Sequence, residues 1–170
     1  MRADWCAPPG AKAGEEVPFW IIDSSDWVNI VARAEGGEYI MVRQWRFGTR
    51  HVSLEIPGGI VDPGEEPARA AARELVEETG FVPAGPVRSL GTVDPNPAIL
   101  SNRTHLFYAE GCRPATDAEK RAMDAHERIE LRLVRPDELD GLIASGEISH
   151  SIMLAALLKY RSQQSTQPRP

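Results

Sequence analysis

Acidic side chains gather in one short stretch near the middle of the chain. Glu74, Glu77 and Glu78 lie within residues 66–79, a segment whose composition predicts a helix. Because an α-helix turns about 100° per residue, the three carboxylates fall within an arc of roughly 100° on one face. Like charges at this spacing repel one another and destabilise a helix. A hard divalent cation that prefers oxygen ligands, such as Mg²⁺, is therefore the expected partner of this face.

Residues beside the acids could support such a site. Arg73 precedes Glu77 by four positions, so the two side chains can pair on one helix face. Glu65 lies at the predicted helix start, where a negative charge interacts favourably with the helix dipole. Gly58 and Gly59 leave the backbone bare beside the helix, so a main-chain carbonyl could add a metal ligand. A solvated charged helix is the alternative, and it explains the acids but not the arginine and glycines at their spacing.

Residues 59–81 resemble the Nudix box. This pattern has a glycine, five residues, a glutamate, seven residues and then R-E-hydrophobic-x-E-E-x-G-hydrophobic. The matching residues are Gly59, Glu65, Arg73, Glu74, Leu75, Glu77, Glu78, Gly80 and Phe81. An aliphatic residue is commoner at the position of Phe81. The chain is thus similar to Nudix hydrolases, which use a divalent metal and water to cleave a diphosphate linked to another group.

The resemblance implies a fold, a cofactor and a set of site residues. The fold is of the α/β (α+β) class, an α/β/α sandwich with a mixed β-sheet between helices. Glu74 and Glu78 would be the principal metal ligands, with Glu77 as a third and the carbonyl of Gly58 as another. Arg73 and Glu77 would also belong to the catalytic set. The metal would be Mg²⁺, with Mn²⁺ able to substitute.

The resemblance leaves the general base open between two places. In some branches of the family it is a glutamate of the box. In the ADP-ribose branch it is a glutamate on a loop before a late strand, and Glu127 directly precedes the strand predicted at 128–134. We therefore expect Glu127 to be the base, with Asp124 as second choice. The alternative is that both are ordinary acids on a surface loop.

The residues that lead into the box are similar to those of ADP-ribose pyrophosphatases and related sugar-nucleotide hydrolases. Those enzymes often read R-Q-aromatic-R and then, after a gap, L-E-x-P-x-G. The matching residues are Arg43, Gln44, Trp45, Arg46, Leu54, Glu55, Pro57 and Gly59. Arg46 is the best candidate for a phosphate contact, because a guanidinium can bind two oxygens at once. Its alternative role is that of a surface arginine, and Glu55 either joins the site or ends a strand. Pro97 fits this branch, but Ala98 follows it where a glycine is common.

Two tryptophans could stack on a base of the substrate. Trp20 and Trp27 lie in segments predicted as strands, and an aromatic–base stack contributes about 1–3 kcal/mol. A strand tryptophan more often belongs to the core or to an interface. Stacking on a base and packing in the core or an interface therefore both stay open for Trp20 and Trp27.

Together these residues favour hydrolysis of a nucleoside diphosphate linked to another moiety. The first candidate is ADP-ribose or a related sugar nucleotide, and ADP-ribose would give AMP and ribose 5-phosphate. An alternative within the family is a hydrolase of nucleoside triphosphates, dinucleotides or coenzyme A. From another class, the alternative is a non-catalytic module that uses the fold to bind a ligand. The complete set of box acids argues against the module.

The surrounding pattern predicts the elements that position these residues. The predicted helix at 66–79 begins with Pro67 in its first turn and ends before Gly80. Alternating, β-branched and aromatic stretches predict strands, and two further helices close the chain. The strands are predicted at 17–22, 27–33, 38–46, 53–56, 87–93, 103–109 and 128–134, and the helices at 136–144 and 149–161. Strands mixed with helices on this scale fit one domain with a mixed sheet.

Length, charge and cysteines bound the remaining possibilities. We expect an irregular N-terminal arm at 1–16, one domain at 17–162 and a disordered tail at 163–170. The net charge of −6 argues against nucleic-acid binding, which needs a basic face. No stretch approaches the roughly 20 apolar residues of a membrane span. Two cysteines without a CxxC pair favour a reducing cytoplasm. Relatives of the ADP-ribose type are often homodimers, and the tryptophan-bearing N-terminal strands permit such an assembly.

Overall fold

The structure is a computed structural model, and it describes residues 1–7, 9–12, 14–120 and 128–166. Ten strands and three helices make up the described chain. The strands are β1 (Arg2–Cys6), β2 (Val17–Ile21), β3 (Trp27–Ala34), β4 (Tyr39–Arg46), β5 (His51–Glu55), β6 (Gly58–Ile60), β7 (Phe81–Val82), β8 (Arg88–Val93), β9 (Thr104–Pro114) and β10 (Ile129–Val134). The helices are α1 (Pro67–Thr79), α2 (Leu139–Ala144) and α3 (Ser151–Thr166).

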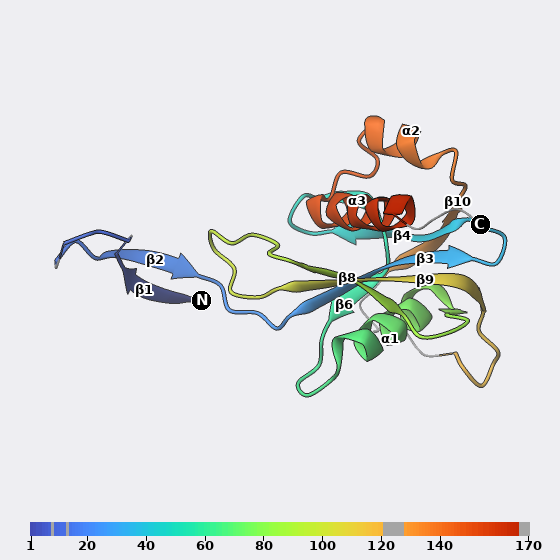
Figure 1. Cartoon of the computed structure of the whole chain (residues 1–170), viewed down its shortest axis with the longest axis horizontal. Coiled ribbons are helices and arrows are strands. Elements are labelled where there is room, and N and C mark those ends of the chain that lie inside the picture. Colours follow the sequence, from blue (N-terminus) through green and yellow to red (C-terminus); the bar gives the residue numbers. More distant parts are fainter. Residues whose placement is uncertain (8, 13, 121–127, 167–170) are drawn as a thin grey trace.

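One mixed sheet organises the domain. Its central order is β10-β4-β3-β9-β7, while β5 extends β4, β6 extends β3 and β8 extends β9. Strands β3 and β9 run parallel, and the other pairs in this sheet are antiparallel. Figure 1 shows α1 on one side of the sheet and α3 on the other. The expected α/β/α sandwich with a mixed sheet is confirmed.

Each face of the sheet has its own core. On the α1 side, Ala70, Ala71 and Leu75 pack with Val28 and Ile30, all of them fully buried. On the α3 side, the buried side chains of the helix pack on residues of β3, β4 and β9; the helix contributes Ile152, Met153, Ala156, Leu157 and Tyr160. The small alanines of α1 let the helix lie close to the sheet. That proximity places the acidic face of α1 beside the end of β6.

Local signals explain where α1 begins and ends. Pro67 is in the first turn, where its missing N–H costs no helical hydrogen bond. Gly80 adopts a left-handed backbone with φ of 69° and donates its N–H to the Val76 carbonyl. The predicted helix at 66–79 is thus confirmed within one residue.

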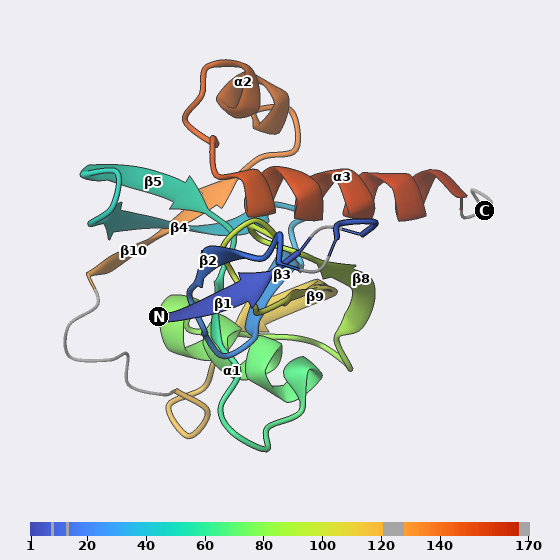
Figure 2. The ribbon, with the colours of Figure 1, turned by 90° about the vertical axis from the view of Figure 1, so that its left-hand side faces the viewer.

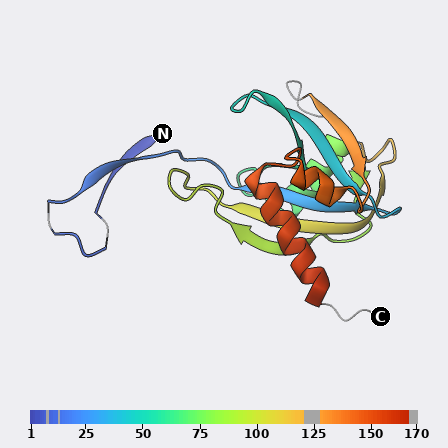
Figure 3. The ribbon, with the colours of Figure 1, turned by 90° about the horizontal axis from the view of Figure 1, so that it is seen from above.

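The ends of the chain differ from expectation. The segment 1–16, predicted to be irregular, contains β1, which pairs antiparallel with β2. This hairpin projects away from the rest of the domain in Figures 1 and 3. Pro9, Gly10 and Gly14 lie between the two strands in the sequence, so the composition of this segment did not reveal the pairing. At the other end, residues 163–166, expected to be disordered, continue α3 to Thr166. Figure 2 shows this helix running from the middle of the view toward the C-terminus at the right.

The prediction located most of the other elements and missed two very short strands. Strands β6 and β7 have only three and two residues, too few for a periodic pattern to indicate them. None of the helices in the described chain combines the length and the apolar character that crossing a bilayer requires.

Candidate active site

A cleft of about 770 Å³ lies where α1, β6 and the start of α3 approach one another. Most residues singled out from the sequence line it. Its lining includes Trp27, Arg46, Glu55, Gly58, Gly59, Arg73, Glu74 and Glu77, together with Asn29, Gln44, Asp62 and His150. Residues far apart in the sequence therefore meet in one concave region, with acids on one wall and Arg46 on another.

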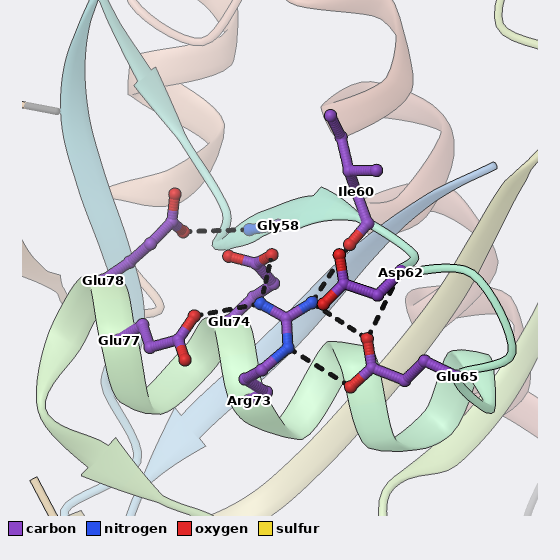
Figure 4. Close-up of polar contacts among 8 residues, drawn as sticks. All are labelled: Gly58, Ile60, Asp62, Glu65, Arg73, Glu74, Glu77 and Glu78. Atoms are coloured by element: carbon purple, nitrogen blue, oxygen red, sulfur yellow. Dashed lines mark hydrogen bonds and ion pairs between the residues drawn. The ribbon is translucent and has the colours of Figure 1, made fainter. Parts of the chain in front are cut away.

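Arg73 is the centre of the acidic wall. Its guanidinium donates to Glu65 at 3.0 Å, to Glu74 at 2.8 Å and to Glu77 at 2.9 Å. It also donates to the carbonyl of Ile60 at 3.0 Å (Figure 4). The hydrogen bond to Glu65 and the charge of Glu74 hold the pKa of Arg73 above its usual value. The same contact with Arg73 lowers the pKa of Glu65.

Glu78 lies apart from this network and is nearly buried. Its side chain is on the next turn of α1 from Glu74, and the residue is only 7% exposed. The backbone N–H of Gly58 donates to its carboxylate at 2.9 Å (Figure 4). The observed contact of Gly58 is made by its N–H. The predicted role of its carbonyl as a metal ligand stays a prediction.

Close contacts rather than unusual backbone angles constrain the two glycines of β6: backbone blocks a Cβ at Gly58, whereas at Gly59 a Cβ would displace the side chain of Glu74. A Cβ on Gly59 would lie 2.3 Å from Oε1 of Glu74. A Cβ on Gly58 would lie 2.2 Å from the carbonyl oxygen of Val28 and 2.1 Å from Nδ2 of Asn29. Asn29 was not singled out from the sequence. It is buried, and its amide donates to the Pro57 carbonyl at 3.4 Å, supporting the turn that leads into β6.

The donor set fits a hard divalent cation, although the acids are not yet arranged around one. In the described ranges, no three histidine, cysteine or acidic side chains converge to form a metal site. Glu74 and Glu77 contact Arg73, whereas Glu78 contacts Gly58. All these donors are oxygens on one wall, as Mg²⁺ requires.

Arg46 and Glu55 form a bidentate ion pair on the opposite wall. Nε and Nη2 of Arg46 donate to the two carboxylate oxygens at 2.8 and 2.6 Å. Glu55 is only 1% exposed, and burial acts to raise its pKa. The hydrogen bonds and charge of Arg46 outweigh burial, so the pKa of Glu55 is below its ordinary value. Arg46, predicted to contact phosphate, lines the cleft, and its ion pair with Glu55 holds the guanidinium in place there.

The remaining predicted residues fall in different places. Trp27 is partly buried against the α3-side core and also lines the cleft. Trp20 lies on β2 of the projecting hairpin, is 63% exposed and is outside the cleft lining. Glu127 and Asp124, the candidate bases, lie outside the described residues.

Besides Asn29, two further polar lining residues were not predicted from the sequence. Asp62 follows β6, and its backbone N–H donates to Glu65 at 3.4 Å. His150 immediately precedes α3, and its buried Nδ1 has no hydrogen-bond partner among the described residues. The sequence offered no signal for it, because a single histidine without metal spacing, inside the helix predicted at 149–161, does not indicate a site.

Comparisons with known proteins concern the family and the fold of the chain. The family model of the NUDIX domain matches residues 25–157. A putative nudix hydrolase 2 from Caenorhabditis elegans is 33% identical over 142 residues, which is 81% of this chain and 64% of that protein. An ADP-ribose pyrophosphatase from Bacillus subtilis (strain 168) is 31% identical, over 82% of this chain and 72% of that protein. A crystal structure of an ADP compounds hydrolase matches with a TM-score of 0.81 and 20% identity, covering 100% of this chain and 95% of that one. This last likeness concerns the fold.

Proposed function

Because the chain belongs to the NUDIX domain family of hydrolases, we propose that it cleaves the diphosphate of ADP-ribose or a related sugar nucleotide with the help of Mg²⁺. For ADP-ribose the products are AMP and ribose 5-phosphate, and Mn²⁺ can substitute for Mg²⁺. The observation that carries the proposal is that Glu74 and Glu77 line one cleft together with Arg46 and the glycines of β6, while the nearly buried Glu78 bonds to the N–H of Gly58 beside them.

The proposed metal ligands are the acids of that wall. Glu74 and Glu78 serve as principal ligands, with Glu77 as a third and the Gly58 carbonyl as another. A bound divalent cation supplies Lewis-acid polarisation of phosphate oxygens and a lower pKa for bound water. The all-oxygen donor set and its position on one helix face support this assignment.

The chain's own residues bind and orient the substrate. Arg73 fixes the rotamers of Glu74 and Glu77 through its hydrogen bonds. Arg46, positioned by Glu55, contacts a phosphate oxygen from the opposite wall. Trp27 offers an apolar surface at the cleft for stacking. Glu127, with Asp124 as second choice, accepts the proton of the attacking water; a box glutamate is the alternative base.

We also propose that two copies of the chain form a homodimer through the N-terminal hairpin. Trp5, Phe19 and Trp20 are large apolar side chains that β1 and β2 leave exposed. Burying such residues between two copies is favourable, at about 25 cal/mol per Å² of apolar surface. In this arrangement Trp20 contributes to the dimer interface. Light scattering of wild type and a Phe19→Ser/Trp20→Ser variant tests it, because a monomeric wild type would disprove the proposal.

A panel of diphosphate compounds with Mg²⁺ tests the activity. The panel holds ADP-ribose, sugar nucleotides, dinucleotides, coenzyme A and nucleoside triphosphates, with phosphate release coupled to a phosphatase. We expect ADP-ribose or a sugar nucleotide to be preferred and Glu78→Gln to lose activity by at least about 10²-fold. Glu66→Gln, an exposed acid at the start of α1, is the matched control. Turnover of triphosphates alone would favour the alternative within the family. Tight ligand binding without turnover would favour a binding module.

A further inference from the structure

A second hollow adjoins the acidic cleft. It has a volume of about 1230 Å³ and lies between the tip of the β4–β5 hairpin and the start of α3. Gln44, Arg46, Glu55 and His150 line both concavities. A molecule whose diphosphate lies at the acidic wall can therefore extend past the Arg46–Glu55 pair into this hollow.

The charge of the hollow is opposite to that of the cleft. Glu55 is the only acid in its lining among the described residues, and it is paired with Arg46. Arg128 adds a guanidinium that makes no ion pair within the described ranges. His51 and His150 add imidazole nitrogens. The described part of the lining thus carries excess positive charge in a protein whose net charge is −6.

The N-terminal end of α3 adds to the positive charge of the hollow. Ser149, His150 and Ser151 line the hollow where α3 begins, and the Leu154 N–H donates to the His150 carbonyl at 3.2 Å. The first turn of a helix presents backbone N–H groups and the positive end of the helix dipole. An anion placed here would be attracted by these N–H groups and by the charge of Arg128.

The lining also suits a sugar that carries the anion. Ser53, Ser149 and Ser151 provide hydroxyl groups, while Phe47 at the hairpin tip is 83% exposed and offers an apolar surface. A phosphate on a hydroxyl-bearing group would match both features.

We propose that this hollow binds an additional phosphomonoester carried by one of the moieties joined through the diphosphate. Between two compounds that differ only by a third phosphate outside the diphosphate, the enzyme would then prefer the one that carries it. This inference rests on the proposed function and names the substrate class of the same site.

A direct binding measurement tests the hollow without catalysis. Imidazole signals are followed by NMR during titration with ribose 5-phosphate or ribose in EDTA, because the metal-free acidic cleft repels phosphate. His51 and His150 should shift with ribose 5-phosphate and not with ribose. His105, which contacts Asp26 elsewhere, is the internal control. The proposal is overturned if neither His51 nor His150 responds, or if ribose is equally effective.

Specificity ratios test the substrate class. The pairs are 2′-phospho-ADP-ribose with ADP-ribose, and coenzyme A with dephospho-coenzyme A. We expect kcat/KM to be about tenfold higher for the phosphorylated member of at least one pair, as one charged hydrogen bond allows. Arg128→Gln should reduce that ratio severalfold. Arg43→Gln should not, because Arg43 points to the other face of β4 from Arg46 and lies outside the lining.

The two proposals fail in different ways. Equal kcat/KM values within both pairs would overturn the inference and leave the proposed function intact. If no diphosphate is hydrolysed, the proposed function is wrong and so is the substrate class that rests on it. The NMR titration would still decide whether the hollow binds phosphate.

Discussion

Replacing Arg46 by methionine should convert Glu55 from a stabilising group to a destabilising one. The wild-type carboxylate is 1% exposed and receives two hydrogen bonds of 2.8 and 2.6 Å from Arg46. Removing one partner of a buried ion pair costs about 3–5 kcal/mol. Because the side chain of Arg46 is 42% exposed, water screens part of this interaction and the expected loss at pH 7 is about 1–3 kcal/mol.

The loss should depend on pH in a defined direction. In wild type the pKa of Glu55 is below its ordinary value of 4.5. Its contribution to stability is therefore complete above pH 4.5 and is lost as the pH falls through the folded-state pKa. In Arg46→Met, burial remains without its main counter-charge, so the pKa of Glu55 rises and the variant gains stability on protonation. The difference between the two proteins should be largest at pH 7 and should shrink as the pH falls, first through the raised pKa of Glu55 in the variant and then through its lowered pKa in wild type.

Urea unfolding at several pH values measures this difference. A double-mutant cycle with Glu55→Gln isolates the pair, since the double variant has neither charge. His150 also acts on Glu55 by its charge, so His150→Gln serves as a background control. A loss in Arg46→Met that is equal at pH 7 and pH 4, or equally large in the Glu55→Gln background, would refute the reasoning.

Two further predictions follow from the site and the core. Gly59→Ala should reduce Mg²⁺-dependent turnover by about 10²-fold with a small change in melting temperature, because its Cβ would lie 2.3 Å from Oε1 of Glu74. The control is Gly85→Ala, whose Cβ would meet nothing within 4 Å. Normal turnover of Gly59→Ala would contradict the prediction. Cys112 should resist a disulfide reagent at pH 8 in the native protein while Cys6 reacts, since burial raises the pKa of Cys112 to about 11 and Cys6 is exposed. Because the thiolate is the reactive form, the rate at Cys112 should rise with pH toward 11; rapid reaction of both thiols at pH 8 would show that the β9 core is open.

The acidic helix could be predicted because its determinants are local. Pro67, the alanines and Gly80 define α1, and helical spacing alone places Glu74, Glu77 and Glu78 on one face. The partner of Glu77 was also predictable, since Arg73 lies one turn earlier. What spacing did not reveal was that Arg73 also binds Glu65, which lies before the helix.

The opposite wall depends on strand register, and register cannot be read from either strand alone. Arg46 and Glu55 were each predicted as site residues, but not as partners. In the structure Val42 lies opposite Glu55, and Arg46 lies opposite His51. Alternation therefore puts Arg46 and Glu55 on the same face of the hairpin. A shift of one residue would place them on opposite faces. The pairing of β1 with β2 is non-local in the same sense.

The cleft and the adjoining hollow differ in charge, and each would bind a different part of a polyanionic substrate. Glu65, Glu74 and Glu77 surround the single guanidinium of Arg73, so the cleft carries excess negative charge and repels a diphosphate. A divalent cation reverses that repulsion locally. In the hollow, by contrast, Arg128 and the start of α3 attract an anion without a metal. If both proposals hold, metal removal should abolish capture of the diphosphate while the hollow still binds a phosphomonoester, so the two ends of one substrate would be held by independent physical means.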